Sequence, residues 1–268
     1  MPDIFLWQEF AVYLVLGAFA GVMAGLLGVG GGLVIVPVLL GVFAWLGFAP
    51  EVMVHLAIGT SLATIVVTSI SSIRAHQRRG AILWPLFWQL TPGILVGAWL
   101  GALVAESLPE VWLRRVFALF VLTVGSRMLL GAREAARWTL PGNLGMGLAG
   151  GLIGAVSAIV GIGGGSMTVP FLHACRVDMR QAVATSSACG LPIAVSGTLG
   201  FVWAGWGQAQ LPPLSTGFVY WPAFAGIVLT STLLAPVGAR LAHSLPLDVL
   251  KRAFALLLLV VGLKLLLD

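Results

Sequence analysis

Two short glycine runs, each set between long apolar stretches without a charged residue, constrain the fold of this chain more than any other feature. The first is Gly28-Val29-Gly30-Gly31-Gly32 and the second is Gly161-Ile162-Gly163-Gly164-Gly165. Because each glycine in a helix costs about 1 kcal/mol relative to alanine, such a run ends a helix. Inside a bilayer, broken backbone is tolerated only where protein or a water-filled cavity satisfies its polar groups. The sequence therefore predicts two interrupted helices, which in many membrane proteins mark a solute-binding site.

The composition is that of a membrane protein. Of the 268 residues, 59% are hydrophobic and 9% are charged, and the mean hydropathy is +1.06. A soluble domain carries about 25% charged residues. The net charge of +5 comes from arginine-rich loops between apolar segments, which set orientation in a membrane and do not indicate nucleic-acid binding. We therefore predict an all-α, polytopic integral membrane protein whose partners are the lipid bilayer and a small solute.

Apolar segments of helical length follow one another along the whole chain. They cover 10–27, 33–47, 52–73, 82–104, 111–130, 143–160, 166–175, 180–204, 217–241 and 247–267. Crossing the ~30 Å hydrocarbon core takes about 20 helical residues, whereas the segment at 166–175 gives only about 15 Å of helix. Each glycine run is therefore predicted to be the tip of a helical hairpin that enters and leaves on the same side. Each hairpin is followed by three predicted transmembrane helices.

The second half of the sequence repeats the first. The stretch Gly21–Leu39 matches Gly154–Leu172 without a gap, and three further matches follow in the same order. These pair Ala57–Ser61 with Ala182–Ser186, Ala105–Pro109 with Ala242–Pro246, and Arg114–Leu119 with Lys251–Leu256. We predict two repeats, at 1–138 and 139–268. Since a hairpin and three crossings form an odd count, the second repeat is expected to be inverted.

The charges of the loops agree with inverted repeats. One predicted face receives most of the cations: Arg74, Arg78, Arg79, Arg127, Arg133, Arg137, Arg176, Arg180, Arg240, Lys251 and Arg252. The other receives fewer cations and most of the acids: Arg114, Arg115 and Lys264, with Asp3, Glu9, Glu51, Glu106, Glu110 and Asp268. By the positive-inside rule the first face is cytoplasmic, so both termini are predicted to be extracytoplasmic. The N-terminal stretch has no positive region, which argues against a cleaved signal peptide.

The glycine tips are candidate anion sites. A helix that begins at such a tip presents unpaired backbone N–H groups and the positive end of its dipole, and glycine lets a ligand approach the backbone. An oxyanion is the natural ligand of this arrangement. The alternative, that the glycines only let two hairpins pack tightly, stays open. No Lys-Ser/Thr pair follows either run, so a phosphate-binding P-loop is disfavoured.

Hydroxyl side chains gather near both tips in the sequence. The pairs Thr60-Ser61 and Thr185-Ser186 occupy matching positions of the two halves, and Ser157, Ser166 and Thr168 flank the second tip. A hydroxyl in a membrane helix often donates to its own i−4 carbonyl instead, and this alternative stays open for each. The predicted substrate-binding residues are Gly28, Gly30, Gly31, Gly32, Thr60, Ser61, Gly161, Gly163, Gly164, Gly165, Ser166, Thr185 and Ser186.

The sequence offers few residues for ion coupling, proton transfer or metal binding. No acidic residue lies deep in a predicted span, so a dedicated Na⁺ or proton carboxylate is not visible, although His55, His173 and His243 near segment ends leave a proton relay open. Cys175 and Cys189 lack metal-ligand spacing, and no metal or cofactor is expected. Glycines at four-residue spacing, from Gly17 to Gly25 and from Gly93 to Gly101, predict closely packed helix pairs.

The duplicated glycine motif resembles that of the TauE/SafE sulfite exporter family, also called the toluene sulfonate uptake permeases. The resemblance covers roughly residues 15–267 and rests on Gly-x-Gly-Gly-Gly followed by an apolar stretch and proline, with Ala-x-x-Thr-Ser further on. It implies secondary transport of sulfite, organosulfonates or related sulfur compounds across the bacterial inner membrane, often as export. The motif falls on Gly28, Gly30, Gly31, Gly32 and Pro37, and again on Gly161, Gly163, Gly164, Gly165 and Pro170.

Four classes of function compete. The leading prediction is an alternating-access transporter, which the inverted, interrupted helices favour, and a channel for the same anion is the alternative. An intramembrane serine protease is disfavoured because Ser166 lacks a trailing glycine and no obvious base lies on a later span. A transition-metal transporter would need clusters of His or Cys. We therefore predict a transporter that is not an enzyme.

Overall fold

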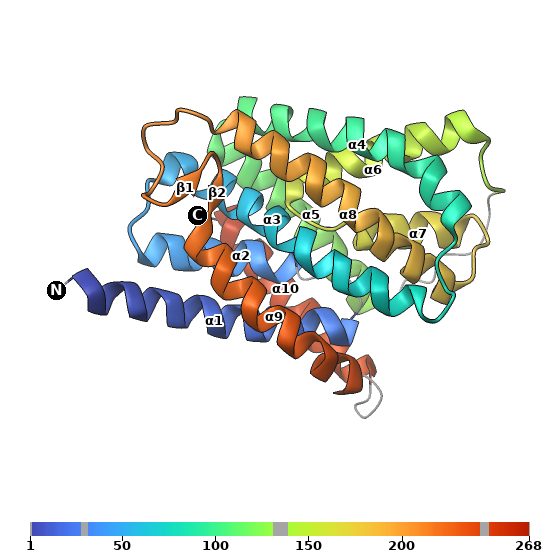
Figure 1. Cartoon of the computed structure of the whole chain (residues 1–268), viewed down its shortest axis with the longest axis horizontal. Helices are drawn as coiled ribbons and strands as arrows, with labels where there is room; N and C mark the ends of the chain where they lie inside the picture. The colour runs from blue at the N-terminus through green and yellow to red at the C-terminus, as the bar shows by residue number, and fades with distance from the viewer. Residues whose placement is uncertain (1, 28–31, 131–138, 242–246, 268) are drawn as a thin grey trace.

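The computed structural model describes residues 2–27, 32–130, 139–241 and 247–267, and over this range the protein is almost entirely helical (Figure 1). The helices of the first half are α1 (Pro2–Leu27), α2 (Gly32–Trp45), α3 (Pro50–Gln77), α4 (Trp84–Ser107) and α5 (Glu110–Leu130). Those of the second half are α6 (Asn143–Val160), α7 (Gly165–Ala174), α8 (Met179–Ala204), α9 (Trp221–Leu241) and α10 (Leu247–Leu267). The predicted all-α class is confirmed.

Every predicted apolar segment contains a helix, and most boundaries agree to within a few residues. The largest difference lies at the N-terminus, where α1 begins at Pro2 instead of residue 10. Four described helices, α3, α4, α6 and α8, are long and apolar enough to cross a membrane. Length and composition thus support a multi-pass membrane protein. They also show that α6, predicted as one arm of a hairpin, has the length of a crossing.

Both glycine runs separate helices that double back. Figure 1 shows α2 running back alongside α1 toward the end of the molecule where the N-terminus lies. It shows α7 running from the end of α6 in the other direction, away from the two termini. The connection between α7 and α8 and the C-terminal end of α3 lie at one end, whereas the connection between α2 and α3 and the C-terminus lie at the other. The two hairpins therefore point toward each other.

The packing of the helices is reciprocal between the halves. In the predicted repeat α1 corresponds to α6 and α4 to α9, and the two most extensive helix pairs are α4 with α6 and α1 with α9. The third is α4 with α8, and the two after it join corresponding helices, α5 with α10 and α3 with α8. A two-fold relation between the halves would produce this pattern. The inverted repeat itself remains a prediction, which the packing supports.

Glycines allow close approach in the two most extensive helix pairs. A β-carbon on Gly93, Gly97 or Gly101 of α4 would clash with the backbone of Gly147, Gly151 or Ala155 of α6. On the other side of the molecule, a β-carbon on Gly17 or Gly21 of α1 would clash with Ile227 or Ser231 of α9. The prediction that these glycines mark close helix pairs is confirmed.

A short β-hairpin precedes α9, where the sequence predicted helix from residue 217. It consists of β1 (Ser215–Thr216) and β2 (Val219–Tyr220), with Gly217 at a φ of 51° between them. The buried Phe218 stacks on the His55 ring at 5.0 Å, and its N–H donates to the Phe201 carbonyl at 3.2 Å. The hairpin thereby ties α3 to α8. The first half connects α3 to α4 through residues 78–83 alone, so the hairpin is an insertion in the second repeat.

Candidate functional site

The second glycine tip has a defined backbone. Gly161 ends α6 with a φ of 74°, and the Ile162 N–H donates back to the Ser157 carbonyl at 2.9 Å. Gly164 precedes α7 with a φ of 74° as well. Both angles belong to the left-handed region that favours glycine. The chain therefore turns twice within four residues, which is why α7 leaves in a new direction.

This tip is held between α3 and α8. On one side, Ser61 Oγ donates to the Gly161 carbonyl oxygen at 2.9 Å, and a β-carbon on Gly163 would lie 3.1 Å from Ile65 Cγ2. On the other side, a β-carbon on Gly190 would lie 2.9 Å from the Gly163 carbonyl oxygen. The backbone of the tip therefore passes between two central helices that come from different halves of the chain.

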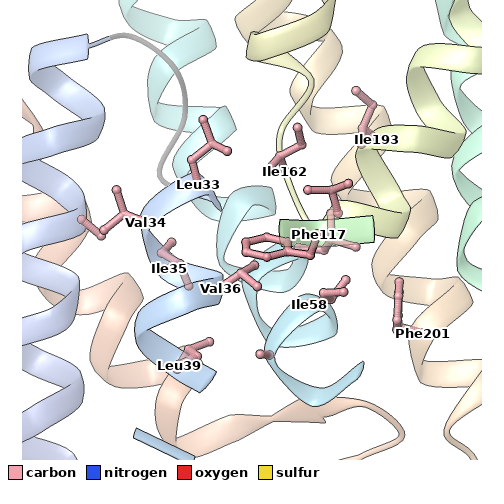
Figure 2. Close-up of a cluster of buried hydrophobic side chains, with 14 of the residues drawn as sticks. Leu33, Val34, Ile35, Val36, Leu39, Ile58, Phe117, Ile162, Ile193 and Phe201 are labelled. Atoms are coloured by element: carbon pink, nitrogen blue, oxygen red, sulfur yellow. The ribbon is translucent and has the colours of Figure 1, made fainter. Parts of the chain in front are cut away.

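The first tip reaches the second through Gly32. A β-carbon on Gly32 would lie 2.7 Å from the Gly161 carbonyl oxygen and 3.0 Å from Ile162 Cα, so the start of α2 touches the second tip. Figure 2 labels Leu33, the next residue of α2, and Ile162 of the second tip. The predicted site residues Gly28, Gly30 and Gly31 lie outside the described residues.

Four consecutive backbone N–H groups at the second tip have no partner. Among the described residues, no hydrogen bond uses the N–H of Gly163, Gly164, Gly165 or Ser166. The first partnered groups are those of Met167 and Thr168, which donate to the Gly164 carbonyl at 3.0 and 2.8 Å. These free groups lie at the positive end of the α7 dipole, the arrangement that binds anions in other proteins.

Three buried hydroxyls that have no partner among the described residues flank the same tip in the sequence, and a fourth lies on α8. The side-chain oxygens of Ser157, Ser166, Thr168 and Ser186 are buried and have no hydrogen-bond partner in the described part of the chain. Leaving such a group unsatisfied costs about 1–3 kcal/mol. Sequence analysis placed Ser157 and Thr168 beside the tip but did not include them in the site. Their proximity to the second glycine run was the signal that favoured them.

The predicted threonines have structural partners instead. Thr60 Oγ1 accepts from the Tyr220 N–H at 3.0 Å, and Thr185 Oγ1 accepts from the Leu83 N–H at 3.0 Å. Each bond fixes the residue immediately before a helix that begins Trp-Pro, α9 in one case and α4 in the other. The two threonines thus make equivalent hydrogen bonds in the two halves. Of the four predicted hydroxyls on α3 and α8, only Ser186 is left without a partner.

The surroundings of the tip are uncharged. The side chains nearest to its glycines are Val36, Ile58, Ile65, Ile193 and Thr168. No Arg, Lys, Asp or Glu is buried among the described residues, and the same residues contain no cluster of three or more His, Cys, Asp or Glu that would hold a metal ion. His55 lies six residues before Ser61, about 9 Å along α3, and contacts the Ala105 carbonyl at 3.0 Å. The site is therefore a neutral set of hydrogen-bond donors.

Comparison with known proteins decides the family. The profile of the sulfite exporter TauE/SafE family matches residues 13–265, nearly the whole chain. The chain belongs to the sulfite exporter TauE/SafE family. A probable membrane transporter protein of Haemophilus influenzae is 37% identical over 93% of this chain and 95% of its own length. No solved structure matches the chain significantly.

Other TauE/SafE relatives are more distant. The probable membrane transporter protein YunE of Bacillus subtilis is 28% identical over 67% of this chain and 73% of its own length. The probable inner membrane transporter protein TsaS of Comamonas testosteroni is 28% identical over 77% of this chain and 82% of its own length. All three relatives are named as transporters. The resemblance noted from the glycine motifs is thus confirmed as family membership, in keeping with a transporter and not an enzyme.

Proposed function

We propose that this TauE/SafE protein is a secondary transporter that exports a small sulfur oxyanion, sulfite or an organosulfonate, across the bacterial inner membrane. The observation that carries the proposal is the second glycine tip. Among the described residues, the N–H groups of residues 163–166 and the buried hydroxyls of Ser157, Ser166 and Thr168 have no partner there, and the tip lies between α3 and α8 in contact with Gly32 of the first hairpin. An anion would satisfy these donors.

No cation is buried in the part of the chain that the structure describes, and this suits transport. A helix N-terminus contributes up to ~2 kcal/mol toward a partly buried anion, which is enough to select a charge without holding it irreversibly. A buried arginine would bind more tightly, but its own burial in the empty site would be costly. Donors without a fixed charge therefore favour a carrier that must release its ligand on the far side.

Alternating access is the mechanism that the packing supports. The predicted repeats 1–138 and 139–268 meet most extensively through α4 with α6 and α1 with α9, and also through α5 with α10 and α3 with α8. The second tip lies between α3 and α8. If one repeat rocks against the other, the site opens to one side and then to the other. A channel for the same anion remains the alternative.

Counterflow in proteoliposomes tests the proposal. Sulfite, thiosulfate, sulfoacetate and taurine are loaded inside separate vesicles, and uptake of the same labelled anion is measured with and without the internal pool. A carrier predicts saturable uptake that the internal anion accelerates. Uptake that rises linearly with concentration and ignores the internal pool would indicate the channel, and no uptake of any of the four would contradict the proposal.

A further inference from the structure

The β-hairpin packs between α3 and α8, as the second glycine tip does, but nearer to the end of the molecule that carries both termini (Figure 1). On α3, a β-carbon on Gly59 would clash with the Phe218 carbonyl, whereas the tip lies against Ile65, about 9 Å further along the helix. On α8, the Phe218 N–H donates to the Phe201 carbonyl, whereas the tip lies against Ile193, about 12 Å away. The β-hairpin therefore occupies the space between these helices on one side of the tip.

The β-hairpin fits closely into this position. Phe218, Val219 and Tyr220 are buried, with exposed fractions of 3%, 0% and 5%. The Tyr220 ring makes edge contacts with the rings of Tyr13 on α1 and Phe43 on α2. A solute that leaves the second tip toward the end with both termini must therefore displace the β-hairpin, which closes that side of the site in this structure.

His55 of α3 packs against the β-hairpin and has one free ring nitrogen. Its ring stacks on Phe218 with the centroids 5.0 Å apart, and its Nε2 lies 3.0 Å from the Ala105 carbonyl oxygen. Because a carbonyl only accepts, Nε2 carries the hydrogen and Nδ1 of the neutral ring is a lone pair. Nδ1 is buried and has no partner among the described residues. A proton taken up by His55 therefore goes to Nδ1, where the described chain offers no acceptor.

Building on the transport function above, we propose that His55 is a proton-binding switch: protonation of Nδ1 releases the β-hairpin and opens the site toward the predicted extracytoplasmic side. The closed arrangement holds the neutral ring, because a charged ring with an unpaired N–H is costly to bury among aromatic side chains. If the ring turns outward, the new N–H reaches water, and the stack on Phe218 is lost. Since the released state binds the proton more tightly than the closed state, a lower pH favours release.

The charged groups around His55 come from three helices. Glu106 of α4 is exposed and acts on the charge of His55, so it favours a protonated ring that has turned outward. At the starts of α3 and α5, Glu51, Glu110 and Arg114 interact with one another, and Glu110 Oε2 is buried without a partner in the described chain. The β-hairpin faces the His55 ring with an uncharged phenylalanine. Glu110 is therefore the second group at this end that would respond to pH, and it provides the control.

Cysteine labelling of the purified full-length protein tests the inference without a transported anion. Val219→Cys places a thiol at a residue of β2 that is 0% exposed, and Leu214→Cys places one at a residue that is 66% exposed, as a reference for the reagent. Peptide mass spectrometry distinguishes both from the native Cys175 and Cys189. An exposed histidine has a pKa of about 6.5. The labelling rate of Val219→Cys relative to Leu214→Cys should therefore rise about tenfold from pH 8 to pH 5.5.

His55→Gln separates a proton switch from simple packing. Glutamine keeps a donor for the Ala105 carbonyl but does not titrate, so the labelling ratio should be the same at both pH values. Glu110→Gln, the matched control, should keep the rise. If His55→Gln does not fold, Phe218→Leu removes the ring stack and should give rapid labelling at both pH values.

Three results would overturn the switch. They are a labelling ratio that does not change with pH when His55 is present, a rise that Glu110→Gln abolishes and His55→Gln retains, and a Phe218→Leu protein that protects residue 219 as well as its parent does. Failure of counterflow with every sulfur anion would instead refute the proposed function, and the labelling result would still report whether protonation releases the β-hairpin.

Discussion

Ser61 and Gly161 are 100 residues apart in the chain, yet the Ser61 hydroxyl donates to the Gly161 carbonyl oxygen at 2.9 Å. This bond joins the first half of the protein to the glycine tip of the second. It satisfies the carbonyl of the residue that ends α6, so the tip is fixed against α3.

Replacing Ser61 should therefore damage both the fold and transport. In Ser61→Ala the Gly161 carbonyl remains buried without a donor, which costs about 1–3 kcal/mol, and the tip is free to shift. We expect a lower midpoint of thermal unfolding in detergent and a lower maximal rate of counterflow. Ser107→Ala is the control, because that exposed hydroxyl donates only to its own helix at Val104. Equal unfolding midpoints for the two variants would contradict the role given to Ser61.

The contact between α4 and α6 gives a stability test with an internal control. In Gly97→Ala the new methyl group meets the Gly151 backbone, so the helices must separate. Overpacking of this kind typically costs about 1–3 kcal/mol. In Gly147→Ala, on the facing helix, the methyl group meets nothing within 4 Å, and the higher helix propensity of alanine should leave stability equal or slightly raised. Unfolding in mixed micelles measures both, and equal destabilisation would show that α4 and α6 do not approach as described.

Gly164 combines a left-handed backbone with a crowded site. Gly164→Leu forces a side chain onto a residue with a φ of 74°, directly against Ile193 Cδ1. Transport of every anion should be abolished while the protein still inserts, which membrane fractionation checks. Gly80→Ala separates the two causes, because Gly80 has a φ of 61° but open space around it. If Gly80→Ala is as inactive as Gly164→Leu, then backbone strain alone, and not the site, explains the loss.

Single-cysteine labelling tests the inverted topology. Cysteines placed at 75–79 should react only with reagents that reach the cytoplasm, and those at 106–110 only with impermeant reagents added outside. Both termini should be extracytoplasmic, since the positive-inside rule assigns the arginine-rich loops to the cytoplasm. Finding the loops at 75–79 and 106–110 on the same side would exclude three crossings after each hairpin.

Periodicity and glycine spacing were enough to predict the helices and their close pairs. The run from Gly93 to Gly101 indicated an interface because small residues four apart let helix backbones approach. The repeat match also predicted which residues correspond, such as Thr60 and Thr185. It could not predict what they contact, because the acceptors and donors lie far away in the sequence: Tyr220 binds Thr60, and Leu83 binds Thr185.

The β-hairpin before α9 was not predicted, because it too depends on residues that lie far away in the sequence. Residues 217–220 are apolar and adjoin an apolar helix, so hydropathy extends the helix over them. The hairpin is stabilised by tertiary contacts, with Phe218 on His55 and Phe201 and Gly217 against Val202. Likewise, the hydroxyls beside the second tip were visible in the sequence, but their lack of partners among the described residues was not.

A structure with a bound ligand tests the central claim most directly. The protein in lipid nanodiscs would be imaged with saturating ethanesulfonate, and with sulfite in parallel. The account predicts density for the sulfonate within hydrogen-bonding distance of the backbone nitrogens of residues 163–166, with the Thr168 and Ser186 hydroxyls turned toward it. Density for the anion elsewhere, with those N–H groups still unpartnered, would contradict the assignment of the second glycine tip as the transport site.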